Sequence, residues 1–135
     1  MNKNLIIVFV RTPELGKVKT RLAKSIGDQS ALTIYKLLLK HTASVTHDLS
    51  FDKVVYYSEK VVENDFWDAN LFQKKVQKGT DLGERMQNGF ETAFEQGYEK
   101  ALIIGSDLFD LKPTHITTAF KALETHDFAV GPSLD

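Results

Sequence analysis

The sequence predicts a single α/β domain whose largely parallel β-sheet is covered by helices on both faces. Two observations lead to this fold class. Short apolar segments suited to buried strands alternate with amphipathic segments suited to helices, and the strand segments end in polar loops that contain glycine or proline. Such an order implies right-handed crossovers between parallel strands.

The first strand is predicted at residues 5–10, where all six residues are apolar and include β-branched and aromatic side chains. A run of this length is too short to cross a membrane and is typical of a strand that is buried on both faces. The chain then enters the sequence RTPELG at residues 11–16, in which proline and glycine interrupt regular structure.

A helix is predicted next, with Asp28 as its N-cap and its end near His47, because apolar residues recur there at helical spacing. A second strand is predicted at residues 53–57. The polar residues 59–70 are predicted to form a loop with one helical turn around Phe66 and Trp67, two aromatic residues expected to pack in the core or at its edge. A short third strand is predicted at residues 71–76.

The second half of the chain repeats this alternation. An amphipathic helix is predicted from Asp81 to near Gly97, with an inner stripe formed by Leu82, Met86, Phe90, Ala93 and Phe94. A buried strand follows at residues 101–104. A further helix is predicted to begin near Pro113, with Ile116 on its inner face, and a fifth strand is predicted at residues 127–130.

Composition limits the classes of protein that the chain can represent. Its 135 residues suit one compact domain, which we assign to residues 1–135. The formal net charge of −1 argues against a nucleic-acid partner. The absence of cysteine excludes disulfides and thiolate metal sites. Because no signal peptide or membrane span is recognised, we expect a cytoplasmic protein.

Positive charge is concentrated after the first strand, where five basic residues lie between Arg11 and Lys24. A buried strand that leads into a glycine-containing loop with converging cations suits a phosphate-bearing ligand, because backbone N–H groups and cations both attract an anion. The alternative is a solvated basic loop that precedes a helix. The loop is not a Walker A motif, since Val18 follows Gly16-Lys17, and no GxGxxG dinucleotide motif follows the strand.

Ligands of open parallel sheets bind at the carboxyl ends of the strands, a rule that selects the loops at residues 11–21, 105–110 and 131–135. Asp107 is a candidate ligand of Mg²⁺ or Mn²⁺, because these cations bind carboxylate and phosphate oxygens. Alternatively, Asp107 caps the next helix or forms a turn. Arg85 follows two glycines at the start of a helix, and it would either form a local ion pair near Glu84 or reach a ligand.

Four ordered motifs resemble the DUF2064 proteins, bacterial members of the glycosyltransferase-A superfamily of nucleotide-diphospho-sugar transferases. The motifs are RTPELGKVKTRL at residues 11–22, GTDLGERM at 79–86, IGSD at 104–107 and GP at 131–132. The resemblance covers essentially the whole chain. It implies a Rossmann-like, three-layer α/β/α fold with a mostly parallel sheet, and it implies binding of a nucleotide or nucleotide sugar with a divalent cation.

By this resemblance Arg11, Lys19 and Arg21 would contact phosphates, and Asp107 would correspond to the metal aspartate of the superfamily. Lys19 and Asp107 are therefore the candidate catalytic residues, and Asp135 is a second candidate metal ligand. The candidate residues for binding the nucleotide and its phosphates are Arg11, Gly16, Lys17, Lys19, Thr20, Arg21, Gly83, Arg85 and Ser106.

The chain departs from the family pattern at two places. Leu108-Phe109 replaces the usual residues after the metal aspartate, so we expect a different path for that loop. The family pattern also continues beyond Asp135, and we therefore expect that the C-terminal acceptor-side region is lacking, with Asp135 as a terminal residue.

The resemblance implies a metal-dependent glycosyltransferase that uses a nucleotide-diphospho-sugar donor. One alternative is a nucleotidyltransferase that releases pyrophosphate from a nucleoside triphosphate. Another is a non-catalytic, truncated domain that binds a nucleotide without turnover. An exposed sheet edge would favour a homodimer.

Overall fold

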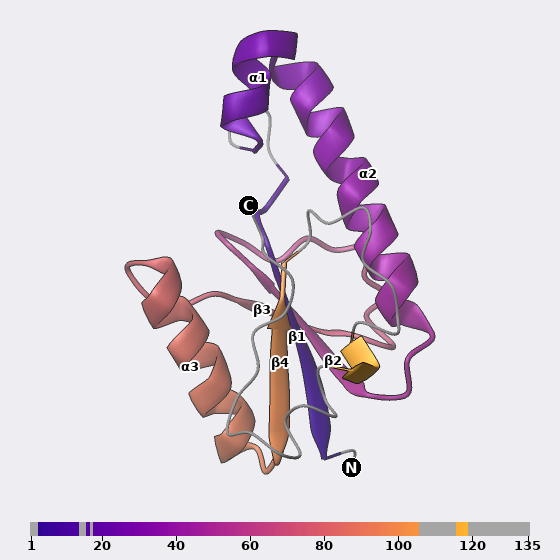
Figure 1. Ribbon diagram of the computed structural model, residues 1–135, viewed down its shortest axis with the longest axis vertical. Helices are drawn as coiled ribbons and strands as arrows, with labels where there is room; N and C mark the ends of the chain where they lie inside the picture. Colours follow the sequence, from indigo (N-terminus) through magenta and orange to yellow (C-terminus); the bar gives the residue numbers. More distant parts are fainter. Residues whose placement is uncertain (1–2, 14–15, 17, 106–115, 119–135) are drawn as a thin grey trace.

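The computed structural model describes residues 3–13, 16, 18–105 and 116–118, with the backbone alone at residues 20–22. Its strands form one sheet in the order β3-β2-β1-β4, and helices pack against it (Figure 1). The elements are, in chain order, β1 (Asn4–Val10), α1 (Thr20–Ile26), α2 (Asp28–His47), β2 (Asp52–Tyr57), β3 (Gln73–Val76), α3 (Leu82–Glu95) and β4 (Lys100–Ile104).

Strand β1 lies inside the sheet, between β2 and β4. It pairs in parallel with β2, where Ile7 lies opposite Val54, and with β4, where Ile7 lies opposite Ile103. Residues 5–10 are all buried, as expected for an inner strand of a parallel sheet that is covered on both faces. The predicted α/β fold with a parallel sheet is therefore confirmed.

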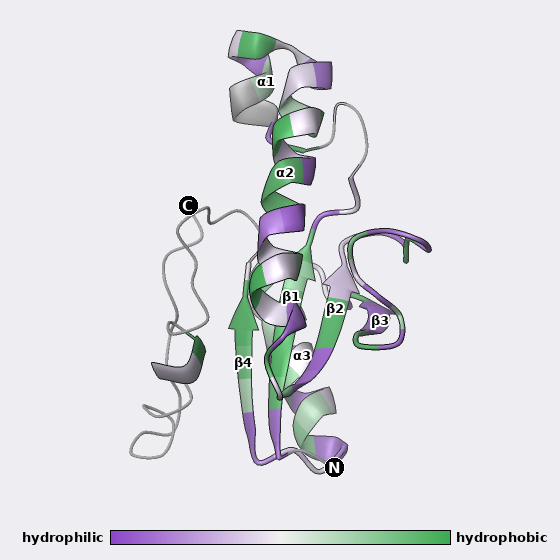
Figure 2. Ribbon diagram, turned by 90° about the vertical axis from the view of Figure 1, so that its right-hand side faces the viewer, coloured by the Kyte–Doolittle hydropathy of each residue, from purple (hydrophilic) through white to green (hydrophobic). Residues whose placement is uncertain are grey.

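The side chains of β1 alternate between two hydrophobic cores, one on each face of the sheet. Ile6, Val8 and Val10 belong to the core beneath α2, and Leu5, Ile7 and Phe9 belong to the core beneath α3. Figure 1 shows α2 and α3 on opposite sides of the sheet, and Figure 2 shows hydrophobic residues along most of β1 and β4. Ile116, in the helical segment 116–118, joins the first core at 1% exposure, as predicted.

The basic loop, which was predicted at residues 11–21, is shorter than that. Helix α1 begins inside the predicted range, at Thr20, and contains Arg21. The assignment of Asp28 as a helix cap was also wrong, since Asp28 is the first residue within α2 and Gly27 precedes it. Gly27 serves both helices: its N–H donates to the carbonyl of Ala23 at 2.8 Å, and its own carbonyl accepts from the N–H of Ala31 at 3.1 Å. Its φ of 90° favours glycine and reverses the chain between α1 and α2.

Helix α2 ends at His47, as predicted. The ammonium group of Lys53 donates to the carbonyl of His47 at 2.7 Å and lies 5.5 Å from the ring centroid of Phe72. A cation at this position interacts favourably with the negative end of the helix dipole. Burial lowers the pKa of Lys53, and the nearby charge of Asp48 opposes this shift.

The loop between β2 and β3 lacks the helical turn expected around Phe66 and Trp67. Trp67 is confirmed as a core residue, since it is buried and packs edge-on against Phe72 with 5.1 Å between ring centroids. The carbonyl of Asp68 accepts the N–H groups of Leu71 and Phe72 at 2.9 and 2.8 Å. Because this turn occupies both residues, β3 begins later than predicted.

Helix α3 is confirmed, with the middle of its predicted inner stripe against the core and the two ends of that stripe exposed. Leu82 and Phe94, which were expected inside, are exposed at 57% and 52%. The buried residues of α3 are Gly89 and Ala93. A Cβ atom at Gly89 would lie 3.7 Å from the ring of Phe9. These small residues let the helix axis approach the sheet closely, and the larger residues at the helix ends point outward.

Strand β4 is confirmed. The fifth strand at residues 127–130, and the helix beyond residue 118, lie outside the described residues. In the described part of the chain, no helix is long and apolar enough to cross a membrane. The homodimer remains a prediction.

Candidate functional site

The carboxyl ends of the four strands meet at one edge of the sheet, because every strand pairing is parallel. Ligands of parallel sheets bind at this edge. Strand β1 leads there into the basic loop, and α1 with the first half of α2 extends beyond the edge (Figure 1). The candidate site therefore comprises this loop, the neighbouring strand ends and the start of α3.

Arg11 begins the basic loop, and its backbone is fixed while its side chain is exposed. Its N–H donates to the hydroxyl of Tyr35 on α2 at 2.7 Å. Tyr35 itself is buried. The first cation of the loop thus has a rigid backbone position and a side chain that is accessible to a ligand.

Hydrogen bonds of Thr12 connect the loop after β1 to the loop after β2. Its N–H donates to the Ser58 hydroxyl at 2.9 Å, and its own hydroxyl donates to the carbonyl of Lys60 at 3.1 Å. The same hydroxyl accepts the N–H groups of Glu59 and Lys60, each at 3.2 Å. Thr12 is 3% exposed, so these bonds replace water. Thr12 was not predicted as a functional residue, because a threonine after a strand gives no signal of its distant partners.

Gln77 joins the ends of three strands. Its backbone N–H donates to the carbonyl of Tyr57 at 2.8 Å, which continues the pairing of β3 with β2. Its side-chain NH₂ group donates to the carbonyls of Val10 and Tyr56 at 3.1 and 3.0 Å. The side chain therefore holds β1 and β2 together at the point where the basic loop begins. Sequence reasoning also missed Gln77, which lies in a polar segment.

Arg85 lies in the first turns of α3 and points toward the strand ends. Its Nε donates to the carbonyl of Gly79 at 3.0 Å, and its Nη1 donates to Oε1 of Gln77 at 3.2 Å. A local ion pair near Glu84 was one of the two alternatives for Arg85. The carboxylate of Glu84 instead accepts a hydrogen bond from the Thr80 hydroxyl at 3.2 Å. Arg85 is thus engaged with the protein at the edge of the candidate site.

Lys19 adopts the left-handed conformation, with φ 49° and ψ 45°, directly before α1. This conformation is uncommon for a residue with a side chain, and such residues often occur at functional sites. Earlier in the loop, Gly16 has a φ of 79° and lies beside Asp28: a Cβ atom at Gly16 would be 3.5 Å from Oδ2 of that carboxylate. The basic loop therefore folds back on the start of α2, where the carboxylate of Asp28 lies beside it.

The remaining candidate residues separate into two groups. Thr20 and Arg21 lie in the first turn of α1, and Gly83 lies exposed in the first turn of α3. That turn is capped by Asp81, whose carboxylate accepts the N–H of Glu84 at 2.8 Å. The other candidates, Lys17, Ser106, Asp107 and Asp135, lie outside the described residues.

The predicted metal ligands Asp107 and Asp135 belong to this second group, so the structure leaves the metal site as a prediction. Among the residues that the structure does describe, no group of three histidine, aspartate or glutamate side chains could hold a metal ion.

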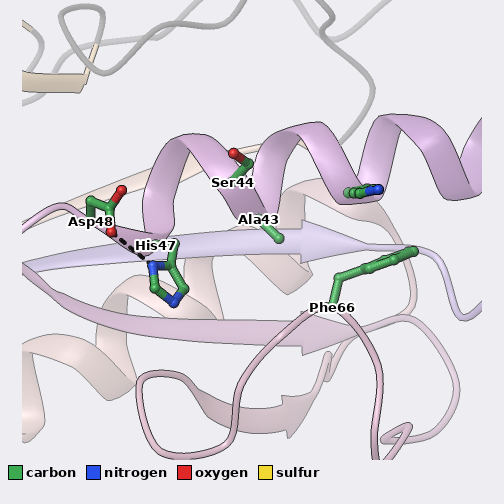
Figure 3. Close-up of a pocket in the computed structure, with 6 residues that line it drawn as sticks. Ala43, Ser44, His47, Asp48 and Phe66 are labelled. Atoms are coloured by element: carbon green, nitrogen blue, oxygen red, sulfur yellow. Dashed lines mark hydrogen bonds and ion pairs between the residues drawn. The ribbon is translucent and has the colours of Figure 1, made fainter.

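Two pockets lie away from the predicted phosphate loop. The first, of about 280 Å³, is lined by Lys40, Ala43, Ser44, His47, Asp48 and Phe66. Figure 3 shows the imidazole of His47 beside Asp48, with 2.9 Å between Nδ1 and Oδ1, while the Ser44 hydroxyl points away from the imidazole. The three side chains therefore lack the geometry of a nucleophile, base and acid relay.

The second pocket, of about 470 Å³, lies where β2 and β3 begin, and Asp52, Lys53 and Gln73 contribute to its lining. This is the edge opposite to the strand ends. The carboxylate of Asp52 accepts the Tyr98 hydroxyl at 2.7 Å, and the Lys53 ammonium is bound at the end of α2. Both charged groups are occupied by structural contacts, so the loop after β1 remains the better candidate site.

Comparisons with known proteins bear on the family and the fold of the chain. A model of the family described as "Uncharacterized protein conserved in bacteria (DUF2064)" matches residues 41–135. The chain also matches the crystal structure, at 1.90 Å resolution, of a putative nucleotide-diphospho-sugar transferase from Desulfovibrio desulfuricans G20, with 29% identity and a TM-score of 0.81. This likeness confirms the expected nucleotide-diphospho-sugar transferase fold. No curated protein matches the chain.

The match to the Desulfovibrio protein covers 92% of this chain but only 55% of that one. The chain therefore spans about half the length of the Desulfovibrio protein.

Proposed function

The chain belongs to the DUF2064 family, and from this premise we propose that it binds a nucleotide-diphospho-sugar and transfers the sugar to an acceptor with the help of a divalent cation. The observation that carries the proposal is the position of the basic loop. Arg11 and Lys19 follow the inner strand β1 at the carboxyl edge of a parallel sheet. The likeness to the Desulfovibrio protein supports the same class of donor.

In the proposed reaction the bond between the anomeric carbon and the diphosphate oxygen breaks. An oxygen of the acceptor forms the new bond to that carbon and releases its proton to water, and the nucleoside diphosphate leaves with the electron pair of the broken bond and the added negative charge. Arg11, Lys19 and Arg21 are the proposed ligands of the diphosphate. Each charge-assisted hydrogen bond of this kind contributes about 1.5–3 kcal/mol, and those that strengthen as charge develops accelerate the step.

Asp107 is the proposed principal ligand of Mg²⁺ or Mn²⁺, with Asp135 as a second. Such cations are commonly bound by one or two carboxylates and by the phosphates of the substrate. When bound, the cation would offset negative charge on the departing diphosphate.

A product assay tests the proposal. The protein would be incubated with UDP-, GDP- and CDP-sugars, Mn²⁺ and a panel of hydroxyl-bearing acceptors, with detection of the released nucleotide and of the glycosylated acceptor. We expect release of a nucleoside diphosphate that stops when the metal is chelated. Pyrophosphate release from a nucleoside triphosphate and a sugar phosphate would instead establish a nucleotidyltransferase. Metal-dependent nucleotide binding without any product would establish a binding domain and contradict the proposed transfer.

A further inference from the structure

A continuous series of hydrogen bonds connects α3 to the end of β1. The guanidinium of Arg85 donates to Oε1 of Gln77 at 3.2 Å, and the NH₂ group of Gln77 donates to the carbonyl of Val10 at 3.1 Å. Val10 directly precedes Arg11, the first cation of the basic loop. The first turns of α3 are thereby linked to the start of the proposed phosphate-binding loop.

The chemistry of this link requires the amide of Gln77. Its NH₂ group donates to two carbonyls on neighbouring strands, those of Val10 and Tyr56, while its oxygen accepts from Arg85. A carboxylate of the same size could accept from Arg85 but could not donate to either carbonyl. A leucine could do neither.

Arg85 fixes the orientation of that amide. Its Nε is held by the carbonyl of Gly79 at 3.0 Å, which sets the plane of the guanidinium. Its Nη1 then faces Oε1 of Gln77, and this contact leaves the amide nitrogen directed at the two strand carbonyls. Gly79 allows the close approach, since a Cβ atom there would lie 2.9 Å from the backbone nitrogen of Arg85.

We propose that Gln77 and Arg85 act as one positioning unit for the basic loop, and that Arg85 serves the nucleotide site through Gln77 and not by contact with the ligand. The inference rests on the proposed function, in which this loop binds the diphosphate. It differs from the ligand contact that the sequence left open for Arg85, because Nε and Nη1 of Arg85 donate to the protein among the described residues.

A double-mutant cycle on nucleoside-diphosphate affinity tests the unit. Gln77→Glu and Arg85→Lys should each raise the dissociation constant about tenfold, and the double variant should be no weaker than either single variant. Asn88→Ala is the matched control: it removes a hydrogen bond of 2.7 Å from α3 to the carbonyl of Lys78 in the same segment. This control should change the affinity less than about twofold.

Additive losses, with the double variant about a hundredfold weaker, would overturn the proposal. So would an Arg85→Lys variant that keeps wild-type affinity, because the positioning role needs two donors of the guanidinium, which a lysine ammonium does not reproduce in the same plane.

Amide hydrogen exchange without ligand separates this inference from the proposed function. Gln77→Glu and Arg85→Lys should each accelerate exchange of the Arg11 and Thr12 amides about tenfold, whereas Asn88→Ala should leave both rates unchanged. Unchanged rates in the Gln77 and Arg85 variants would overturn the positioning unit even if nucleotide binds. A wild-type protein that binds no nucleotide would overturn the proposed function, and with it the indirect effect of Arg85 on nucleotide binding, whatever the exchange rates.

Discussion

The ammonium of Lys74 and the carboxylate of Asp65 form an ion pair at 2.8 Å, with side chains only 7% and 17% exposed. Asp65 also accepts the Tyr57 hydroxyl at 2.5 Å and the N–H of Trp67 at 3.0 Å. The pair joins β3 to the loop that follows β2. The pKa of Tyr57 is raised, mainly by burial and to a smaller extent by the hydrogen bond to Asp65.

Replacement of Asp65 by alanine should destabilise the protein by about 3 kcal/mol or more, because the buried ammonium of Lys74 loses its counter-ion. Urea denaturation measures this free energy of unfolding. Glu99→Ala is the matched control, since its pair with Lys3 at 3.4 Å is 61–73% exposed, and it should cost less than about 0.5 kcal/mol. Similar losses in the two variants would show that burial of the Asp65 pair has no energetic consequence.

Gly79→Ala should destabilise the protein more than Gly27→Ala. Both glycines have positive φ, 143° and 90°, but a Cβ atom at Gly79 would lie 2.9 Å from the backbone nitrogen of Arg85, whereas nothing lies within 4 Å at Gly27. We expect about 1–2 kcal/mol for Gly27→Ala from backbone strain alone, and a further 1–3 kcal/mol, roughly, for the clash at Gly79. Equal unfolding free energies in urea would contradict the close contact.

Stability should fall at alkaline pH, in part through Tyr98. The pKa of this hydroxyl is raised from 10.0 to about 12, mainly by burial and to a smaller extent by the hydrogen bond to Asp52. The folded state therefore keeps a proton that the unfolded state loses, so this contribution is complete below about pH 10 and is lost as the pH rises toward 12. Tyr98→Phe should flatten the decline of unfolding free energy above pH 10. An identical decline in the two proteins would exclude Tyr98 as a contributor.

Asp107→Asn should abolish the divalent-ion dependence of nucleotide binding, because the amide is a much weaker ligand for Mg²⁺ or Mn²⁺ than the carboxylate. Titration calorimetry with and without Mn²⁺ measures this dependence. Asp110→Asn, three positions later, is the control and should bind as the wild type does. If the Asp107 variant needs the metal to the same degree as the wild type, another residue is the principal ligand.

The sheet could be predicted from the sequence because inner strands have a local signature. Residues 5–10 and 54–57 are continuous apolar runs, and both lie in strands buried on two faces. Helix α1 was missed because its seven residues include two cations that suit a phosphate loop equally well. Only the two ends of the inner stripe of α3 were misplaced, because periodicity favoured the large residues Leu82 and Phe94, while close packing placed Gly89 against the sheet.

The candidate site was predicted only in part, for a different physical reason. Cations and glycines in the loop after β1 gave a local signal, and the fold brings that loop to the carboxyl edge of the sheet. The groups that hold the loop are partners far apart in the sequence: Thr12 bonds to the loop after β2, and Gln77 bonds to Val10 and Tyr56. Single-residue chemistry does not reveal such pairings, because they depend on strand order.

Titration calorimetry of the wild-type protein and of Lys19→Ala with UDP, GDP and CDP, each with and without Mn²⁺, tests the central claim most directly. We expect one diphosphate to bind at micromolar concentration in the presence of metal, and Lys19→Ala to weaken binding by about 1.5–3 kcal/mol. Lys24→Ala, which changes an exposed cation in the last turn of α1, should keep the wild-type affinity. No binding of any diphosphate by the folded wild-type protein, or full affinity in Lys19→Ala, would contradict a phosphate site in this loop.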